Sequence, residues 1–226
     1  VNEVFEENIE SDSQSGTDVM LMADDMITME PLSDHMLSGG SGDIIFSSGG
    51  DIEFQNLDDT IITSTGDITM TADGTINIGN LMTGDSFYSN EDPGEISISA
   101  GNDITTGDLT VRGKGSGEIS VISEYGDVTI DGDITVDMKD MEGEANSSLY
   151  VSGFDVDIMG DMLVKAEADA YANDVAIAEA NADVYADNDL NITGNIEVSA
   201  LATTIEKSHD HGGGWGDHGE DRKSTV

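Results

Sequence analysis

The sequence contains no cysteine, and only 2 of its 226 residues are proline. Without cysteine, disulfide bonds and thiolate metal sites are excluded, so neither holds the fold together. Aromatic residues make up 5% of the chain, and no run of 18 apolar residues occurs. A membrane-spanning helix needs an apolar run of about that length, so the sequence predicts no membrane span.

Basic residues are also scarce, with 7 Lys and Arg against 48 Asp and Glu, and the formal net charge at pH 7 is −41. Recognition of nucleic acid or of anionic membranes requires clustered Lys and Arg, so both are excluded as partners. High charge with few aromatics is also typical of disorder. The regular placement of Ile and Val described next argues instead for a folded chain.

Most of the chain repeats one short phrase, in which a turn residue and an acid or amide precede an apolar, a polar and a second apolar residue. Each unit is a turn followed by a short strand with one apolar edge, which no unit can bury alone, so the units must stack. The clearest units are Gly42-Asp43-Ile44-Ile45-Phe46, Gly50-Asp51-Ile52-Glu53-Phe54, Gly66-Asp67-Ile68-Thr69-Met70, Gly107-Asp108-Leu109-Thr110-Val111, Gly126-Asp127-Val128-Thr129-Ile130 and Gly132-Asp133-Ile134-Thr135-Val136.

The spacing of the first apolar positions predicts an all-β parallel β-solenoid (β-helix) with coils of about 20–25 residues, each made of two or three short strands. Separations of 22 to 24 residues recur between Ile44 and Ile68, Ile52 and Ile76, Ile96 and Ile119, Ile104 and Val128, and Ile134 and Val156. A β-sandwich or barrel is the competing fold. Its hairpins favour Asn-Gly or Asp-Gly turns, whereas most turns here have the reverse order.

The repeat divides the chain into three parts. Residues 1–16 are acidic and Ser-rich, and we interpret them as an irregular leader or cap. Residues 17–205 form the predicted solenoid, and residues 206–226 form a Gly- and His-rich tail or cap. Within the solenoid, residues 164–186 alternate apolar and polar positions as strands do. Their alanine content and a second, helical spacing leave a helix open, and we favour strands.

The repeated Gly-Asp-Ile-Thr units, together with Thr17-Asp18-Val19-Met20-Leu21 and Asn188-Asp189-Leu190-Asn191-Ile192, resemble the repeats of filamentous-haemagglutinin-like exoproteins. The resemblance covers about residues 17–200. It implies a right-handed parallel β-helix at a bacterial surface, of the kind used by adhesins.

The acids at the turns are the first candidate site. In stacked coils equivalent carboxylates lie about 4.8 Å apart, where two charges repel by about 0.9 kcal/mol in water and by about 3.5 kcal/mol at an effective dielectric constant of 20. Calcium would cancel this repulsion with hard oxygen ligands; alternatively, the turns direct the acids into water, where salt screens them. The candidate calcium ligands are Asp43, Asp51, Asp67, Asp108, Asp127 and Asp133.

A second candidate site lies in the tail, where His209, His211 and His218 surround a Gly run. Three neutral imidazoles with nearby carboxylates suit zinc, copper or nickel. The alternative is a polar tail without a ligand.

No nucleophile motif, phosphate loop or dinucleotide fingerprint occurs, so we expect no enzyme activity. The sequence instead predicts an extracellular structural solenoid, either an adhesin stalk or a filament subunit that assembles head-to-tail and is stabilised by calcium. Its other partners would be a polysaccharide or a cell surface. The alternative function is a calcium-dependent β-helix that binds or cleaves polysaccharide, with Arg112 and Lys114 as the basic pair.

Overall fold

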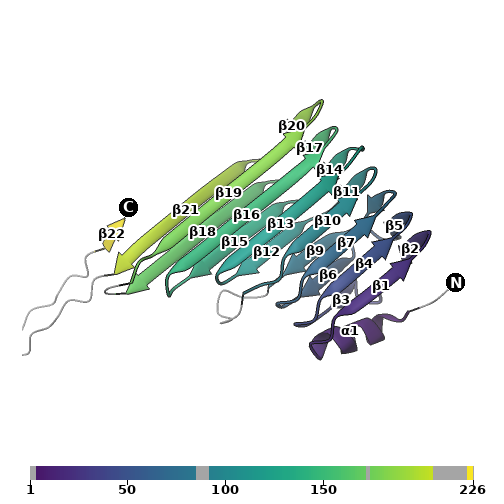
Figure 1. Ribbon diagram of the computed structural model, residues 1–226, viewed down its shortest axis with the longest axis horizontal. Helices are drawn as coiled ribbons and strands as arrows, with labels where there is room; N and C mark the ends of the chain where they lie inside the picture. The colour runs from purple at the N-terminus through teal and green to yellow at the C-terminus, as the bar shows by residue number, and fades with distance from the viewer. Residues whose placement is uncertain (1–3, 85–91, 172–173, 206–222, 226) are drawn as a thin grey trace, which may run out of the picture.

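The computed structural model describes residues 4–84, 92–171, 174–205 and 223–225. Its strands form three sheets of parallel strands, and the chain visits the sheets in turn, so that each circuit is one coil of a solenoid (Figure 1). The predicted parallel β-solenoid is therefore confirmed.

Each sheet contains one strand from each of seven coils. Sheet A consists of β1 (Val19–Ala23), β4 (Ile44–Ser48), β7 (Ile68–Ala72), β10 (Ile96–Ala100), β13 (Ser116–Ser123), β16 (Glu144–Gly153) and β19 (Ile177–Ala186). Sheet B consists of β2 (Met26–Met29), β5 (Asp51–Phe54), β8 (Ile76–Asn77), β11 (Ile104–Thr106), β14 (Val128–Ile130), β17 (Val156–Ile158) and β20 (Leu190–Ile192).

Sheet C consists of β3 (Met36–Ser38), β6 (Thr60–Thr63), β9 (Asn80–Thr83), β12 (Leu109–Gly113), β15 (Ile134–Asp140), β18 (Met162–Tyr171) and β21 (Ile196–Ile205). A short strand, β22 (Lys223–Thr225), pairs antiparallel with the end of β21. Every other strand pair in the three sheets is parallel, as a coil that always turns in one direction requires.

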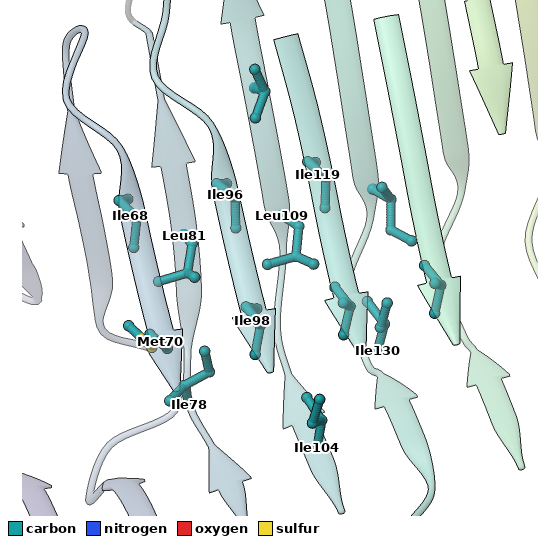
Figure 2. Close-up of a cluster of buried hydrophobic side chains, with 14 of the residues drawn as sticks. Ile68, Met70, Ile78, Leu81, Ile96, Ile98, Ile104, Leu109, Ile119 and Ile130 are labelled. Carbon is teal, nitrogen blue, oxygen red and sulfur yellow. The ribbon is translucent and has the colours of Figure 1, made fainter. Parts of the chain in front are cut away.

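The core lies inside the coils and is built from the apolar residues of the repeat. Ile68, Ile96 and Ile119 stack on successive strands of sheet A, and each is fully buried (Figure 2). Stacking identical residues in this way satisfies the period-two pattern, because one face of every strand points inward. The core changes along the axis, from Phe46 and Phe54 near the N-terminal end to small alanines in β18.

The register confirms four of the five predicted separations and corrects the fifth. Ile134 pairs with Met162 of sheet C and not with Val156, which belongs to sheet B and stacks on Val128. The coils also lengthen beyond the predicted 20–25 residues: Ile44 and Ile68 are 24 residues apart, whereas Val156 and Leu190 are 34 apart. The added residues extend the strands, so that the later strands of sheets A and C are visibly longer in Figure 1.

Residues 164–171 and 177–186 form strands, which confirms the preferred reading of the alanine-rich stretch. The N-terminal segment, in contrast, is not irregular. Residues Glu6–Gln14 form helix α1, which contacts β1 and β3 at the N-terminal end of the solenoid. Acids in its first turn suit the helix dipole, and the buried Ile9 and Ser13 attach it to the first coils. Of the 206–226 tail, only β22 belongs to the described residues.

Candidate functional site

The turn acids form hydrogen-bonded ladders at the corners of the solenoid. At the corner before sheet A, Oδ1 of Asp18 accepts the backbone N–H of Asp43 at 3.2 Å. Asp43 accepts in the same way from Asp67 at 2.9 Å, and Asp67 from Glu95 at 2.8 Å. Each carboxylate therefore binds the backbone of the next coil at the equivalent position, and we call this series the corner ladder of sheet A.

Equivalent ladders occupy the other two corners. Before sheet B, Oδ1 of Asp51, Asp103, Asp127 and Asp155 accepts backbone N–H groups of the following coil at distances of 2.8 to 3.1 Å. Before sheet C, Oδ1 of Asn80, Asp108, Asp133 and Asp161 does the same at 2.7 to 2.8 Å. An amide serves as well as a carboxylate at the Asn80 position, so it is the acceptor oxygen that the corner requires.

Glycine precedes the acid at many of these corners because the coils approach closely there. A Cβ atom on Gly66 would clash with the backbone carbonyl of Gly42 in the preceding coil, and one on Gly94 would clash with that of Gly66. The Gly-Asp pair of the repeat therefore has two structural roles. Glycine permits the close approach, and the acid satisfies a backbone donor that the turn leaves outside the strand ladder.

The six candidate calcium ligands are all ladder residues, but the structure distributes them over three corners. Asp43 and Asp67 lie at the corner of sheet A, and Asp51 and Asp127 at that of sheet B. The remaining pair, Asp108 and Asp133, lies at the corner of sheet C. In each hydrogen bond to the next coil only Oδ1 takes part. Neither sequence interpretation included this role, because both treated the acids purely as charges.

Like charges nevertheless interact along the corner of sheet A. The pKa of Glu95 is raised, first by partial burial of its carboxyl group and then by the negative charges of Glu118 and Asp67. Ionised Glu95 is thus less favourable in the folded chain than in water. Among the described residues, no three His, Cys, Asp or Glu side chains are grouped as metal ligands. The predicted tail ligands His209, His211 and His218 lie outside the described residues.

Four basic residues gather on the outer face of sheet C and at the end of β12. Arg112, Asp137 and Lys165 are cross-strand neighbours in one row of that face. In the next row Lys139 lies 3.4 Å from Glu167, whose other oxygen is 2.7 Å from Lys165. Lys114 pairs with Glu142 at 3.2 Å. The basic pair singled out in the sequence is therefore part of a larger group in which each lysine is matched by an acid.

Burial and neighbouring charges shift the pKa values of two acids in this group, Asp137 and Glu167. Burial raises the pKa of Asp137, against the opposing effect of Lys165 and Arg112. The hydrogen bond from Lys165 lowers the pKa of Glu167. The cluster balances charge across neighbouring strands, which favours one register of β12, β15 and β18.

Two features were missed by sequence reasoning. Asp103 and Asp155 are ladder residues without a preceding glycine, and their only sequence signal is an acid directly before an inward Ile or Val. The second feature is a fully buried carboxylate, Asp59, which accepts hydrogen bonds from the backbone of Leu32 and from the side chains of Asn56 and His35. These hydrogen bonds join the loop after β2, which contains Leu32 and His35, to Asp59 in the next coil.

At the C-terminal end of the solenoid, no further coil follows β19, β20 and β21 among the described residues. Leu190, Ile196 and Val198 stack on Val156, Met162 and Val164, which are buried. They occupy the same inward positions, yet they are 50%, 55% and 45% exposed because none of the described residues forms a further coil over them. This end combines an apolar interior with the outer edges of β19 and β20, on which no other described strand pairs.

Comparison with known proteins found no matching family model, no curated protein and no solved structure. In the described part of the chain, no helix has the length and apolar character needed to cross a bilayer.

Proposed function

We propose that this protein is an extracellular, non-catalytic structural rod, an adhesin stalk or filament subunit that associates head-to-tail through the open C-terminal end. The observation that carries the proposal is the exposure of Leu190, Ile196 and Val198, which continue a fully buried core. An apolar end face bordered by unpaired strand edges is a template for further strands. A second copy that covered this end would bury the apolar side chains and pair the strand edges together.

The corner ladders support a head-to-tail direction. In the ladders before sheets B and C, the acceptors bind N–H groups of the coil that follows, so the last positions of these ladders lie at the C-terminal end. Asp189 and Asn195 hold these last positions, bonded through their own N–H groups to Asp155 and Asp161. A contact between unlike ends would offer these acceptors to backbone N–H groups of the next copy, and a heterologous contact of this kind extends into a filament if it does not close.

The N-terminal end is the complementary partner in this arrangement, although it is smaller. Helix α1 contacts β1 and β3, whereas β2 forms the edge of sheet B. Met26 on β2 is 46% exposed. The C-terminal end of a second copy would therefore contact β2 of this end, and α1 would lie against the wider last coil of that copy. Calcium at the corner carboxylates, a cell-surface location and the right-handed coil direction complete the proposal.

Sedimentation velocity and electron microscopy of paired variants test the joining surface. The double variant Ile196→Asp/Val198→Asp places two charges on the inward face of β21 and should abolish end-to-end particles. Ser199→Asp/Leu201→Asp adds the same charge to the outward face of the same strand and should leave assembly intact. Equal assembly by both variants would rule out the C-terminal end as the joining surface.

Deletion of residues 1–16 distinguishes head-to-tail growth from a closed dimer joined through two C-terminal ends. Head-to-tail growth needs the N-terminal end, so the deletion should change filament length or abolish filaments. A closed pair of molecules joined by their C-terminal ends would survive the deletion as a particle of twice the monomer mass, and that result would reject the head-to-tail arrangement.

A further inference from the structure

The outer face of sheet A carries two straight rows of side chains that run along the rod axis. The strand register fixes both rows, because each residue lies beside its equivalent on the next strand. One row is Met20, Ile45, Thr69, Ser97, Ser120, Tyr150 and Asp183, and the other is Met22, Ser47, Thr71, Ser99, Ile122, Ser152 and Tyr185. We call these fourteen residues the sheet A face.

This face is almost uncharged in a chain whose net charge is −41. Asp183, on the last strand, is the single charged residue of these two rows, and Glu118, Glu144 and Glu179 lie beside the rows on the outer side of β13, β16 and β19. The outer face of sheet B carries Asp51, Glu53 and Asp157, and that of sheet C carries the cluster around Lys165. From β1 to β16 the two rows contain no charged side chain, so a ligand there needs no charge of its own, and its binding does not require a carboxylate of the rows to be stripped of water.

The side chains of the face suit a ligand that is rich in hydroxyl groups. Seven of the fourteen are Ser or Thr, which donate and accept hydrogen bonds through one rotatable hydroxyl. At the C-terminal end the rings of Tyr150 and Tyr185 lie 5.8 Å apart, and Tyr185 is 56% exposed. Surfaces that combine Tyr with Ser bind polar ligands well, because the ring offers rigid contact area and the small hydroxyls adapt.

The periodicity of the face indicates a polymer. Equivalent hydroxyls recur at the strand spacing of about 4.8 Å over successive coils, so the same contact is offered repeatedly along one line. Exposed apolar side chains continue the rows, with Met22 73% and Ile122 38% exposed. A chain of sugar rings presents alternating CH-rich faces and hydroxyl edges, which match this mixture of apolar and hydroxyl groups.

We propose that the sheet A face binds an uncharged polysaccharide that lies along the rod axis, with sugar rings stacked on Tyr150 and Tyr185 and hydroxyls bonded to the Ser and Thr rows. The sheet A face is a side of the rod, whereas end-to-end assembly uses the inward residues Ile196 and Val198 at its end, so this inference goes beyond end-to-end assembly. A second rod packed side by side is the competing occupant. Burying rows of hydrated hydroxyls against identical rows gains little, and the acidic corners beside both faces would repel.

Co-sedimentation with insoluble neutral polysaccharides tests the proposal, using cellulose, chitin, mannan and a β-1,3-glucan as probes and alginate as the anionic comparison. We expect retention on at least one neutral polysaccharide, unchanged by high salt, and none on alginate. Tyr150→Ala/Tyr185→Ala should weaken retention about tenfold, as loss of aromatic anchors does. Thr71→Glu, which charges the middle of the face, should weaken it too, whereas Thr129→Glu on the outer face of sheet B is the matched control and should not.

Three results would overturn the inference. The first is no retention on any neutral probe, and the second is retention that the tyrosine variants leave unchanged. The third is lateral pairing of rods, without polysaccharide, that Thr71→Glu abolishes, which would assign the face to a second copy. Ile196→Asp/Val198→Asp should bind the neutral probe as the unmodified protein does, so failure of end-to-end assembly remains distinguishable from failure of polysaccharide binding.

Discussion

Oδ1 of Asp133 accepts a 2.8 Å hydrogen bond from the backbone N–H of Asp161, one coil further along the solenoid. The N–H of Asp133 itself donates to Oδ1 of Asp108 in the preceding coil at 2.7 Å. One residue therefore joins three coils, and its side chain replaces the strand ladder where the chain turns the corner. The charge of the acid is incidental to this geometry, as the amide of Asn80 at an equivalent position illustrates.

Asp133 gives a direct test of the corner ladder. Asp133→Ala removes the acceptor and leaves the N–H of Asp161 without its partner, so we expect a loss of about 1–2 kcal/mol in the free energy of unfolding. Asp133→Asn keeps an acceptor oxygen and should cost much less. Urea unfolding of both variants measures the difference. Equal losses would mean that charge, and not the acceptor, is what the corner needs.

Glu95 should make the protein less stable at neutral pH than its amide equivalent would. Its pKa is raised in the folded state, so the ionised form is disfavoured there, and the cost is present above that pKa and vanishes as the pH falls through it. Glu95→Gln should therefore raise Tm by about 1–2 °C at neutral pH and have no effect below about pH 4. Glu53→Gln, on the outer face of sheet B, matches the change in net charge. The same gain from both variants would point to net charge alone.

Calcium should stabilise the rod through the corner carboxylates. The Oδ1 atoms bind backbone N–H groups, but the second oxygens of Asp43 and Asp67 take no part in those bonds and remain suited to a hard cation. We expect millimolar calcium to raise Tm above its value in sodium chloride of equal ionic strength, because a ligand of the native state stabilises it. Identical Tm values in the two salts would exclude specific binding, and Asp43→Asn/Asp67→Asn should reduce any calcium effect.

The alanine core of β18 should tolerate little added volume. Ala168 is fully buried between coils, so Ala168→Leu should destabilise the protein by about 1–3 kcal/mol through overpacking. Thr135→Leu adds a similar side chain to the outward face of the neighbouring strand β15 and should be nearly neutral. A small effect of Ala168→Leu on urea unfolding would indicate that these long coils enclose unfilled space.

The sequence allowed the fold to be predicted because its repeat marks both the corner and the first inward residue. Ile44 and Ile68 pair as their spacing predicted. The strand period also predicted residues 164–171 and 177–186 correctly, although their alanine content favours a helix. Ala166 and Ala168 are buried inside the coil, whereas Lys165 and Glu167 form an ion pair on the outside. In these residues the strand period and the polar outward side chains both favoured strands, and together they outweighed the helix propensity of alanine.

Coil length was harder to predict, since spacing alone does not show whether extra residues form a loop or lengthen a strand. Residues 139–140 and 144–147 contain no large apolar side chain, yet they extend β15 and β16, and Ile134 consequently pairs with Met162. Helix α1 was missed because its attachment is tertiary. The Ser13 hydroxyl donates a hydrogen bond to the carbonyl of Gly42, and no local sequence pattern predicts this contact. The ladder hydrogen bonds depend in the same way on where the backbone of the next coil lies.

The lengthening of the coils has a mechanical consequence for a stalk. Five residue pairs join β1 to β4, whereas ten join β16 to β19 and ten join β18 to β21. Under a pull along the axis, the seam between coils with the fewest paired residues should part first. Among the described residues this is the seam between the third and fourth coils, where five, two and three pairs join β7 to β10, β8 to β11 and β9 to β12. The seam between the first two coils has more pairs, and helix α1 reinforces it, because the carbonyl of Ser13 accepts the N–H of Gly42 from the second coil. The rod should therefore open first in its interior and not at its narrow end.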